Sequence, residues 1–148
     1  MKAMLSAGAM ALAFTVCASA EPWVDYAPQK GLYVVTGVKV DPNKIDDYLK
    51  GLKKVWVPGE EIAKKQGIID SYEIMLNMNN TGSGANVLLI EHMTSFAQLD
   101  PNKKRDLELQ KAIEASVPKN ESDSAVAGFD KYRVFTGTEM WQPIEFTK

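Results

Sequence analysis

The sequence has very few of the residues on which thiol and metal sites depend. Cys17 is its single cysteine and His92 its single histidine. No residue after Cys17 can therefore form a disulfide, a zinc thiolate or a nucleophilic thiol. A zinc site needs several nitrogen or sulfur ligands, and no second histidine stands at ligand spacing from His92. We expect no metal site.

Long basic runs are missing as well. The chain has 17 Lys and Arg against 19 Asp and Glu, a formal net charge of −2. The lysine pairs at Lys53–Lys54 and Lys64–Lys65 are short and are separated by acidic residues. Nucleic acids and anionic lipids both favour a basic surface. The composition therefore predicts neither a nucleic-acid partner nor a charged lipid surface.

The first twenty residues carry the strongest targeting pattern. Lys2 is followed by an uncharged stretch that ends in the small residues Ala18, Ser19 and Ala20. This pattern is typical of a secretory signal peptide over Met1–Ala20, which is removed to leave a chain beginning at Glu21. We expect a periplasmic or secreted protein that does not stay in the membrane after cleavage.

Two other interpretations of this segment are weaker. A membrane anchor needs a long, continuous apolar span, and Ser6, Thr15 and Ser19 interrupt this segment. A lipoprotein needs a small residue directly before the modified cysteine, and here Val16 precedes Cys17.

Hydrophobic periodicity predicts the element order β-α-β-β-α-β. Proline and glycine residues mark the interruptions: Pro58–Gly59 breaks the first helix, Gly67 ends it and Pro118 stops the second. The predicted strands are Leu32–Val40, Ile68–Met78, Val87–Met93 and Lys131–Trp141, with a turn at Asn79–Gly84 and a polar loop at Lys119–Ala127.

Helix starts are predicted from capping residues. The tetrapeptide Asp-Pro-Asn-Lys occurs at Asp41–Lys44 and again at Asp100–Lys103. In both copies the aspartate can cap free N–H groups while the proline takes the first helical position. Thr94 is expected to cap a short helical turn that runs to Leu99.

The predicted fold class is α+β, a ferredoxin-like four-stranded antiparallel sheet with two helices on one face. The domain spans residues 32–141, between an extended lead-in at 21–31 and a tail at 142–148. Tyr33, Val35 and Phe135 are expected on the uncovered face. An apolar exposed face needs a partner, so two copies are predicted to pack sheet to sheet as a homodimer.

The chain resembles the dimeric α/β-barrel superfamily, in particular its NIPSNAP-type and antibiotic-biosynthesis-monooxygenase-type members. The resemblance lies in the pattern from Tyr33 to Leu49, in Trp56–Pro58 and in Gly67–Glu73. It implies a ligand cleft between sheet and helices near the helix kink. It also implies activities that range from cofactor-free oxygenation and isomerisation to haem degradation, and it carries over no catalytic residue.

Four residues are candidates for such a site. His92 or Tyr72 is predicted to move a proton, because histidine changes charge near neutral pH and a tyrosine hydroxyl can hydrogen-bond a ligand. Trp56 and Tyr48 are predicted to contact the ligand. Each has an ordinary alternative as a core or surface residue, and Trp56 fits the apolar helix stripe. No cofactor is expected, although a haem needs only one axial ligand and His92 could supply it.

Charged residues in the strands are a second group of interest. Glu73 and Glu91 fall in adjacent strands, where pairing on one face would raise a carboxyl pKa. Lys131 and Arg133 share a predicted face and could neutralise these acids in structural ion pairs.

Two functions of different classes follow. The first is a small-molecule-binding protein, with cofactor-free oxygenation or isomerisation of a small aromatic or apolar substrate as its chemistry. The second is a non-catalytic cell-envelope protein that grips a partner through Trp23, Tyr26, Trp141 and Phe146. A cavity near Trp56 favours the first, and a cleft filled by side chains favours the second. Haem binding through His92 is a third hypothesis.

Overall fold

The computed structural model describes residues 19–79 and 84–148. The predicted signal peptide lies almost entirely outside these residues, as does the middle of the predicted turn at Asn79–Gly84. No helix in the described ranges is long and apolar enough to cross a membrane. The main elements are β2 (Leu32–Val40), α1 (Ile45–Val55), α2 (Val57–Lys65), β3 (Ser71–Leu76), β4 (Val87–Met93), α3 (Lys103–Ser116), α4 (Lys119–Phe129) and β5 (Arg133–Trp141).

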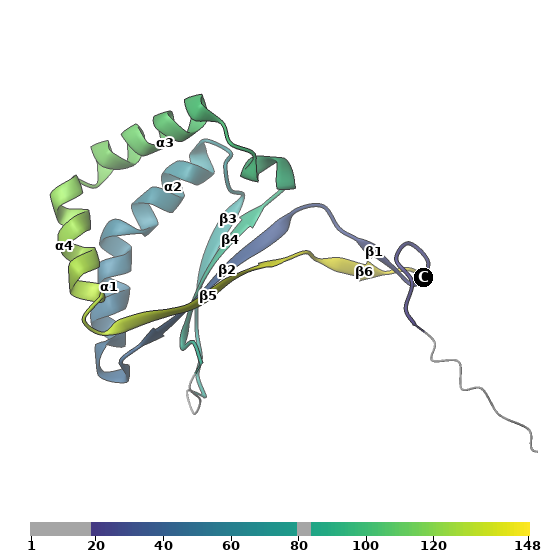
Figure 1. Ribbon diagram of the computed structural model, residues 1–148, viewed down its shortest axis with the longest axis horizontal. Helices are drawn as coiled ribbons and strands as arrows, with labels where there is room; N and C mark the ends of the chain where they lie inside the picture. The colour runs from purple at the N-terminus through teal and green to yellow at the C-terminus, as the bar shows by residue number, and fades with distance from the viewer. Residues whose placement is uncertain (1–18, 80–83) are drawn as a thin grey trace, which may run out of the picture.

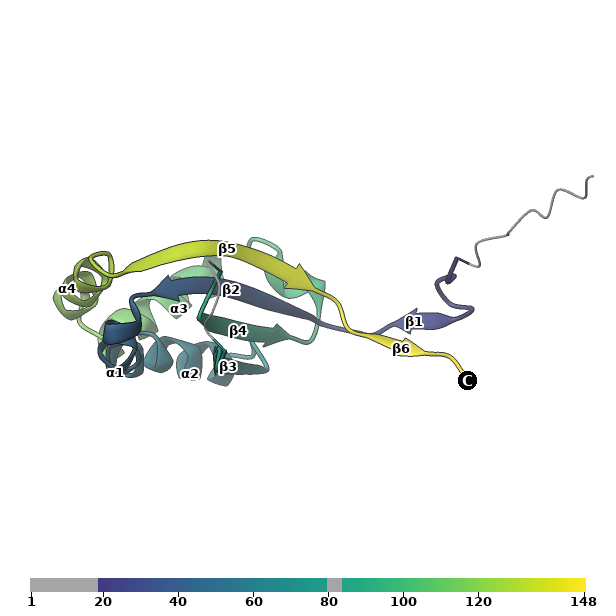
Figure 2. The same cartoon turned by 90° about the horizontal axis from the view of Figure 1, so that it is seen from below.

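The four long strands form one antiparallel sheet in the order β3-β4-β2-β5. Figure 1 shows all four helices on the same side of this sheet, and Figure 2 shows the strands side by side from another direction. Each half of the chain contributes two consecutive helices between its strands. The predicted α+β, ferredoxin-like β-α-β-β-α-β arrangement is confirmed, with each predicted helix position occupied by a pair.

The first helical pair forms as its sequence predicts. The Asp41 carboxylate accepts a hydrogen bond from the Asn43 N–H at 2.9 Å, and a short 3₁₀ turn (Pro42–Lys44) leads into α1. The helix breaks at Trp56, one residue before the start of α2, where Pro58 occupies an early position that needs no N–H donor. Gly67 follows α2 with φ +69°, a left-handed conformation that glycine adopts at little cost.

Three predictions in the second half are wrong. Residues 119–127 are not a loop, because α4 runs from Lys119 to Phe129. Asn102 caps α3, its side chain accepting from the Arg105 N–H at 3.1 Å, so the second Asp-Pro-Asn-Lys copy does not open its helix as the first copy does. Ser95 rather than Thr94 caps the turn Phe96–Leu99, because Gln98 completes a reciprocal capping box with it.

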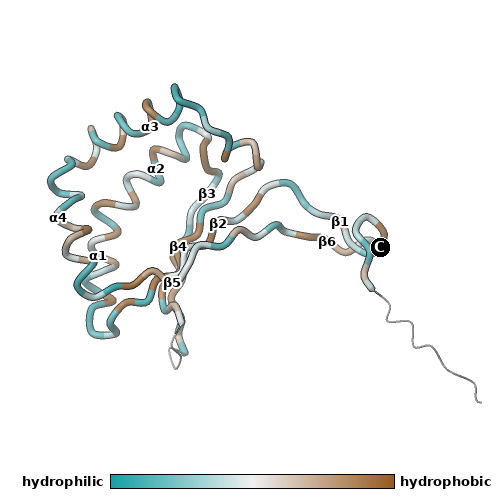
Figure 3. The backbone as a smooth tube through the Cα atoms, viewed as in Figure 1, coloured by the Kyte–Doolittle hydropathy of each residue, from teal (hydrophilic) through white to brown (hydrophobic). Residues whose placement is uncertain are grey.

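The core lies between the sheet and the helices in two clusters. The larger combines sheet residues with α1 and α4: Val38, Val40, Tyr48, Leu52, Val87, Leu89 and Phe129. The smaller joins the other end of the sheet to α2: Leu32, Ala63, Ile69 and Met93. Hydropathy along the backbone is mixed on α1 and α2, whereas α3 is largely hydrophilic (Figure 3). Helix α3 packs mainly against α2, so it forms an outer layer.

A β-bulge in β5 changes which residues face the helices. The pairing of β5 with β2 passes from Gly37↔Gly137 to Val38↔Phe135, which leaves Thr136 without a partner. One extra residue reverses the alternation of side chains along the rest of the strand. Phe135 therefore lies on the helix side, and its predicted place on the uncovered face is wrong.

The uncovered face is apolar, as predicted. Tyr33 and Val35 of β2 lie there beside Leu88 and Ile90 of β4. These residues surround a shallow hollow of about 420 Å³, together with Glu73, Met75, Glu139 and Trp141.

The lead-in and the tail pair with each other. Strands β1 (Tyr26–Pro28) and β6 (Ile144–Phe146) form a separate two-stranded ribbon that extends away from the sheet (Figures 1 and 2). The Thr147 N–H donates to the Asp25 carbonyl at 3.0 Å and extends this pairing by a further contact. Trp23 and Phe146 are 72% and 75% exposed, so the ribbon carries aromatic surface into solvent.

Candidate ligand-binding site

A cavity of about 310 Å³ lies between the helix-facing side of the sheet and helices α1 and α4. Its position near the break at Trp56 is where the family resemblance places a ligand cleft. Most of its lining is apolar or aromatic, with polar groups at a few points: Thr36, Leu52, Val55, Trp56, Leu89, Glu91, Ser122, Val126, Phe129, Arg133 and Phe135.

Each wall has a local cause in the sequence. The stripe of α1 supplies Leu52, Val55 and Trp56, because these positions follow helical spacing. Helix α4 supplies Ser122, Val126 and Phe129 at the same spacing. The bulge in β5 turns Arg133 and Phe135 into the cavity. Two of the three walls thus depend on features that the sequence analysis missed.

A second hollow of about 350 Å³ adjoins the first. It lies among α1, α3 and α4, and it shares Val55 and Ser122 with the main cavity. Its remaining walls come mainly from α3, including Leu109, Ile113 and Asp106. The shared residues place the two hollows side by side.

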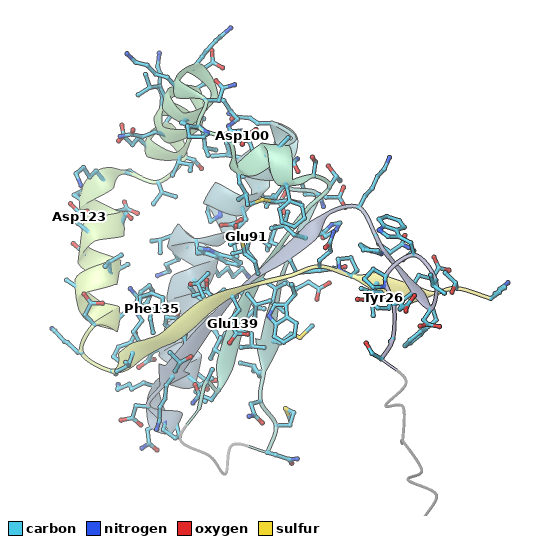
Figure 4. All side chains as sticks on the ribbon, turned by 45° about the vertical axis from the view of Figure 1, so that its right-hand side comes forward. Tyr26, Glu91, Asp100, Asp123, Phe135 and Glu139 are labelled. Carbon is cyan, nitrogen blue, oxygen red and sulfur yellow. The ribbon has the colours of Figure 1, made fainter. Side chains whose placement is uncertain are left out.

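Two carboxyl groups on the helix side have perturbed acidity. Burial raises the pKa of Glu91, which lines the cavity. Burial, followed by the nearby charge of Glu91, raises the pKa of Glu60 to about 7. A carboxyl that titrates near neutral pH can accept a proton from a substrate and return it. Figure 4 shows Glu91 between the sheet and the helices.

The partners that Glu91 has in the structure differ from those predicted from the sequence. Glu91 pairs in register with Tyr72, whereas Glu73 pairs with Ile90, so the two acids lie on opposite faces of the sheet. Glu91 interacts instead with Glu60 of α2, which the sequence analysis did not select. Its position just after the predicted Pro58–Gly59 break, beside the expected cleft, was the available signal.

Tyr72 and Trp56 contact each other at the edge of this site. Their rings meet edge to face with centroids 5.4 Å apart. The Tyr72 hydroxyl donates to Glu61 Oε1 at 2.7 Å, and this hydrogen bond, with a smaller contribution from burial, raises the pKa of Tyr72. The structure therefore brings together two predicted site residues, Trp56 as a wall of the cavity and Tyr72 behind it.

Arg133 lies deep in the same cavity. Its side chain is only 10% exposed, and its guanidinium carbon is 4.8 Å from the Phe129 ring centre and 4.7 Å from that of Phe135. Asp130, at 3.4 Å from Nη2, is its ion-pair partner in the described ranges. The predicted pairing of Arg133 with Glu73 or Glu91 is not among the ion pairs of these residues.

Tyr48 is a core residue beneath the cavity. It is fully buried and packs edge to face against Phe129, with ring centroids 5.0 Å apart. Burial raises its pKa, and the neighbouring Arg133 charge partly offsets this rise. Its hydroxyl has no hydrogen-bond partner among the residues that the structure describes. The cavity lining does not include Tyr48, so the structure gives it a supporting position.

His92 lies on the opposite face of the sheet from this cavity. It pairs in register with Tyr33, stacks on that ring at 4.6 Å, and has Nδ1 3.3 Å from Asp70 Oδ2. The structure therefore does not bring His92 together with Trp56 and Tyr72 as predicted. A Cβ at Gly31 would lie 3.1 Å from Nε2, so a side chain at this position would crowd the His92 ring.

Figure 4 shows the consequence of the bulge for β5: Phe135 and Glu139 lie on opposite sides of the strand. Glu91 and Phe135 belong to the helix side, and Glu139 belongs to the uncovered side. Within residues 19–79 and 84–148, no three His, Cys, Asp or Glu side chains are grouped closely enough to hold a metal ion.

Comparison with known proteins identifies the fold. No protein-family model matches the chain, and no curated protein matches it. Among solved structures, a NIPSNAP family protein of unknown function from Agrobacterium tumefaciens superposes with a TM-score of 0.51 at 15% identity, covering 84% of this chain and 97% of that one. This likeness shows the fold, and it confirms the resemblance in fold inferred from the sequence.

Two further structures match with lower scores. A dimeric ferredoxin-like protein from an uncultured marine organism gives a TM-score of 0.43 at 11% identity, covering 81% of this chain and 90% of that one. A putative antibiotic biosynthesis monooxygenase from Chloroflexus aurantiacus gives 0.41 at 17% identity, covering 79% and 97%. The fold assignment rests on the topology of this chain and on the first match.

Proposed function

We propose that this protein is a periplasmic or secreted homodimer of the dimeric α/β-barrel type that binds a small aromatic or apolar molecule. Its chemistry is cofactor-free proton transfer, used for isomerisation or for oxygenation with dioxygen. The observation that carries the proposal is the cavity beside Trp56, which holds the Glu91 carboxyl in a mostly apolar lining.

The cavity also separates the two functions predicted from the sequence. A cleft filled by side chains would favour a non-catalytic interaction protein, whereas the space beside Trp56 measures about 310 Å³. Ligand pockets in proteins start at about this volume and combine apolar walls with a few polar groups. The arrangement thus supports a ligand-binding role over a purely structural one.

The proposed proton acceptor is Glu91, with Glu60 as its partner. Burial, followed by the nearby negative charge of Glu91, raises the pKa of Glu60 to about 7, so Glu60 retains a proton near neutral pH while Glu91 is the carboxylate that accepts one. In isomerisation the carboxylate removes a proton from one substrate carbon and returns it to another, so no oxidant is needed. In oxygenation the same deprotonated carbon reacts with dioxygen, so that a CH2 group becomes a carbonyl with one oxygen atom while the other oxygen atom leaves as water.

The proposed dimer uses the uncovered sheet face. Two such faces packed together remove the apolar hollow around Tyr33, Val35 and Ile90 from water. His92 then belongs to the interface region, where its contacts with Tyr33 and Asp70 help to order the strand edge. Proton transfer by His92 in the same cleft as Trp56 is not part of this proposal.

Binding is tested with phenylnaphthylamine, an uncharged aromatic probe whose fluorescence rises in apolar sites. The wild type is expected to bind it, and Val126→Trp, which fills the cavity from α4, is expected to weaken binding at least about tenfold. Leu107→Trp on exposed α3 is the matched control. Equal binding by all three proteins would place the probe elsewhere and contradict the proposed site.

Proton transfer is tested by following deuterium entry from heavy water into tetralone, an uncharged aromatic ketone. Glu91→Gln is expected to abolish the acceleration over buffer, because an amide cannot accept the proton. Glu73→Gln is the control, since it makes the same change on the neighbouring strand but on the opposite face. If Glu91→Gln still accelerates deuterium entry into tetralone, Glu91 is not the proton acceptor.

Assembly and localisation have separate tests. Native mass spectrometry of protein from its own host is expected to show a dimer, with the chain beginning at Glu21 and any retained small molecule bound. Titration with haem tests the remaining cofactor hypothesis, and a stoichiometric Soret shift would contradict the cofactor-free proposal.

A further inference from the structure

Arg133 is the feature of the cavity that proton transfer does not use. Its side chain is nine-tenths buried, and it lies over the aromatic rings of Tyr48, Phe129 and Phe135. Its Nε–H is buried and has no hydrogen-bond partner among the described residues. Leaving such a buried donor unpaired destabilises the folded state.

The cation–π contacts stabilise the charge of the buried guanidinium, but they supply no hydrogen-bond acceptor for Nε. Asp130 reaches Nη2 at 3.4 Å, but its side chain is largely exposed and it leaves Nε unpaired. Glu91 shares the cavity with Arg133, but it makes no ion pair with Arg133 among the described residues. The guanidinium is the one positively charged group in the described lining of this cavity.

We propose that the cavity selects organic anions, with Arg133 binding the acidic group of an apolar or aromatic ligand. This inference rests on the proposed function, since it names the substrate class of the same site. The guanidinium also carries Nη–H groups, and these can donate to the oxygens of a carboxylate or sulfonate in the cavity that Arg133 lines.

The walls of the cavity fit the remainder of such a ligand. Trp56, Val126 and Phe129 provide apolar and aromatic contacts away from the guanidinium. The ligand carbon that loses a proton must then lie between Arg133 and Glu91. Arg133 is a ligand-binding residue in this proposal, and Glu91 is the group that exchanges the proton.

The test compares two probes with the same aromatic skeleton type, anilinonaphthalene sulfonate and uncharged phenylnaphthylamine. The wild type is expected to bind the sulfonate at least about tenfold more tightly. Arg133→Gln is expected to remove that preference and to leave phenylnaphthylamine affinity within about twofold. Lys131→Gln, which removes an exposed cation two residues away, is the matched control and should keep the preference.

A second measurement needs no change at Arg133. Arg105 and Arg133 are the only arginines in the sequence, so an NMR spectrum of arginine Nε–H groups contains one signal from each. Arg105→Gln assigns them. Addition of the sulfonate is expected to shift the Arg133 signal and to leave that of Arg105, whose Nε already donates to Asp106 at 2.9 Å.

The outcomes separate this inference from the proposed function. Anion selection would be overturned by equal affinity for both probes in the wild type, or by an Arg133 NMR signal that does not shift in saturating sulfonate. Phenylnaphthylamine binding would still support the cavity in either case. An equal loss of both probes in Arg133→Gln would show that Arg133 only maintains the fold. Failure of both probes to bind the wild type would contradict the anion proposal and the ligand site together.

Discussion

The two faces of the four-stranded sheet differ in what covers them. The helix side is completed by its own chain, because α1, α2 and α4 bury Val38, Leu52 and Phe129 against it. The other side presents Tyr33, Val35 and Ile90 with no covering element from the described chain. Residues of similar hydrophobicity on strand β2 therefore have different roles: folding on the helix side and, in the proposed dimer, association on the uncovered side.

The largest effect is expected on the helix side. Val38→Asp places a carboxylate at a fully buried position, where ionisation is strongly disfavoured. We expect loss of more than about 4 kcal/mol in the free energy of unfolding, enough to unfold most of the protein. Circular dichroism and urea titration measure this, and a native-like transition in the variant would contradict the assignment of the core.

Val35→Asp makes the same change on the same strand but on the uncovered face. We expect a folded protein that no longer dimerises, with the dimer dissociation constant raised more than about a hundredfold. Sedimentation at micromolar concentration checks the mass, and circular dichroism checks the fold. A wild-type protein that sediments as a folded monomer would contradict the proposal that the uncovered face mediates dimerisation.

The pH dependence of stability should come from the helix side. The pKa of Glu60 is raised to about 7 in the folded protein, so the folded state binds this proton more tightly than the unfolded state. The favourable contribution is present below the unfolded pKa, near 4.5, and is lost as the pH rises through about 7.

Glu60→Gln is therefore expected to flatten stability between these pH values and to stabilise the protein at pH above about 7, by about 1–3 kcal/mol. Urea unfolding across this pH range measures it. Glu108→Gln on exposed α3 is the control and should leave the profile unchanged. A Glu60→Gln profile that parallels the wild type would remove Glu60 from the buried acid pair.

The smallest expected effects come from two glycines on the helix side. A Cβ at Gly51 would clash with the Phe129 ring, whereas a Cβ at Gly128 meets nothing within 4 Å. Gly51→Ala is expected to cost about 1–2 kcal/mol despite the better helix propensity of alanine, and Gly128→Ala to gain about 0.5–1 kcal/mol. Equal effects in thermal unfolding would contradict the packing of α4 on α1.

Local patterns predicted the strands and the first helical pair well. The alternation in Leu32–Val40 and Val87–Met93 gave the correct boundaries of β2 and β4, and Asp41 caps its helix as expected. These features depend on neighbouring residues in the chain, which a sequence displays directly. The apolar character of the uncovered face followed from the same alternation.

The site was predicted less well, because it depends on long-range structure. Ser122, Ala125, Val126 and Phe129 have helical spacing, but the polar residues between them resemble a loop. The bulge at Thr136 reversed the expected face of Phe135 and gave Arg133 partners other than those expected, and register is not visible in a single strand. His92 was selected for its chemistry alone, and pairing with Tyr33 places it on the other face.

Sheet order also bears on how the chain acquires its shape during synthesis. The inner strand β2 is made early, but β5, one of its two partners, leaves the ribosome late, and the ribbon needs Phe146 before Tyr26 can pair. The nascent polypeptide therefore lacks a complete four-stranded sheet until translation is almost finished. The proposed export through a narrow channel requires an unfolded chain, and this order of synthesis favours that state.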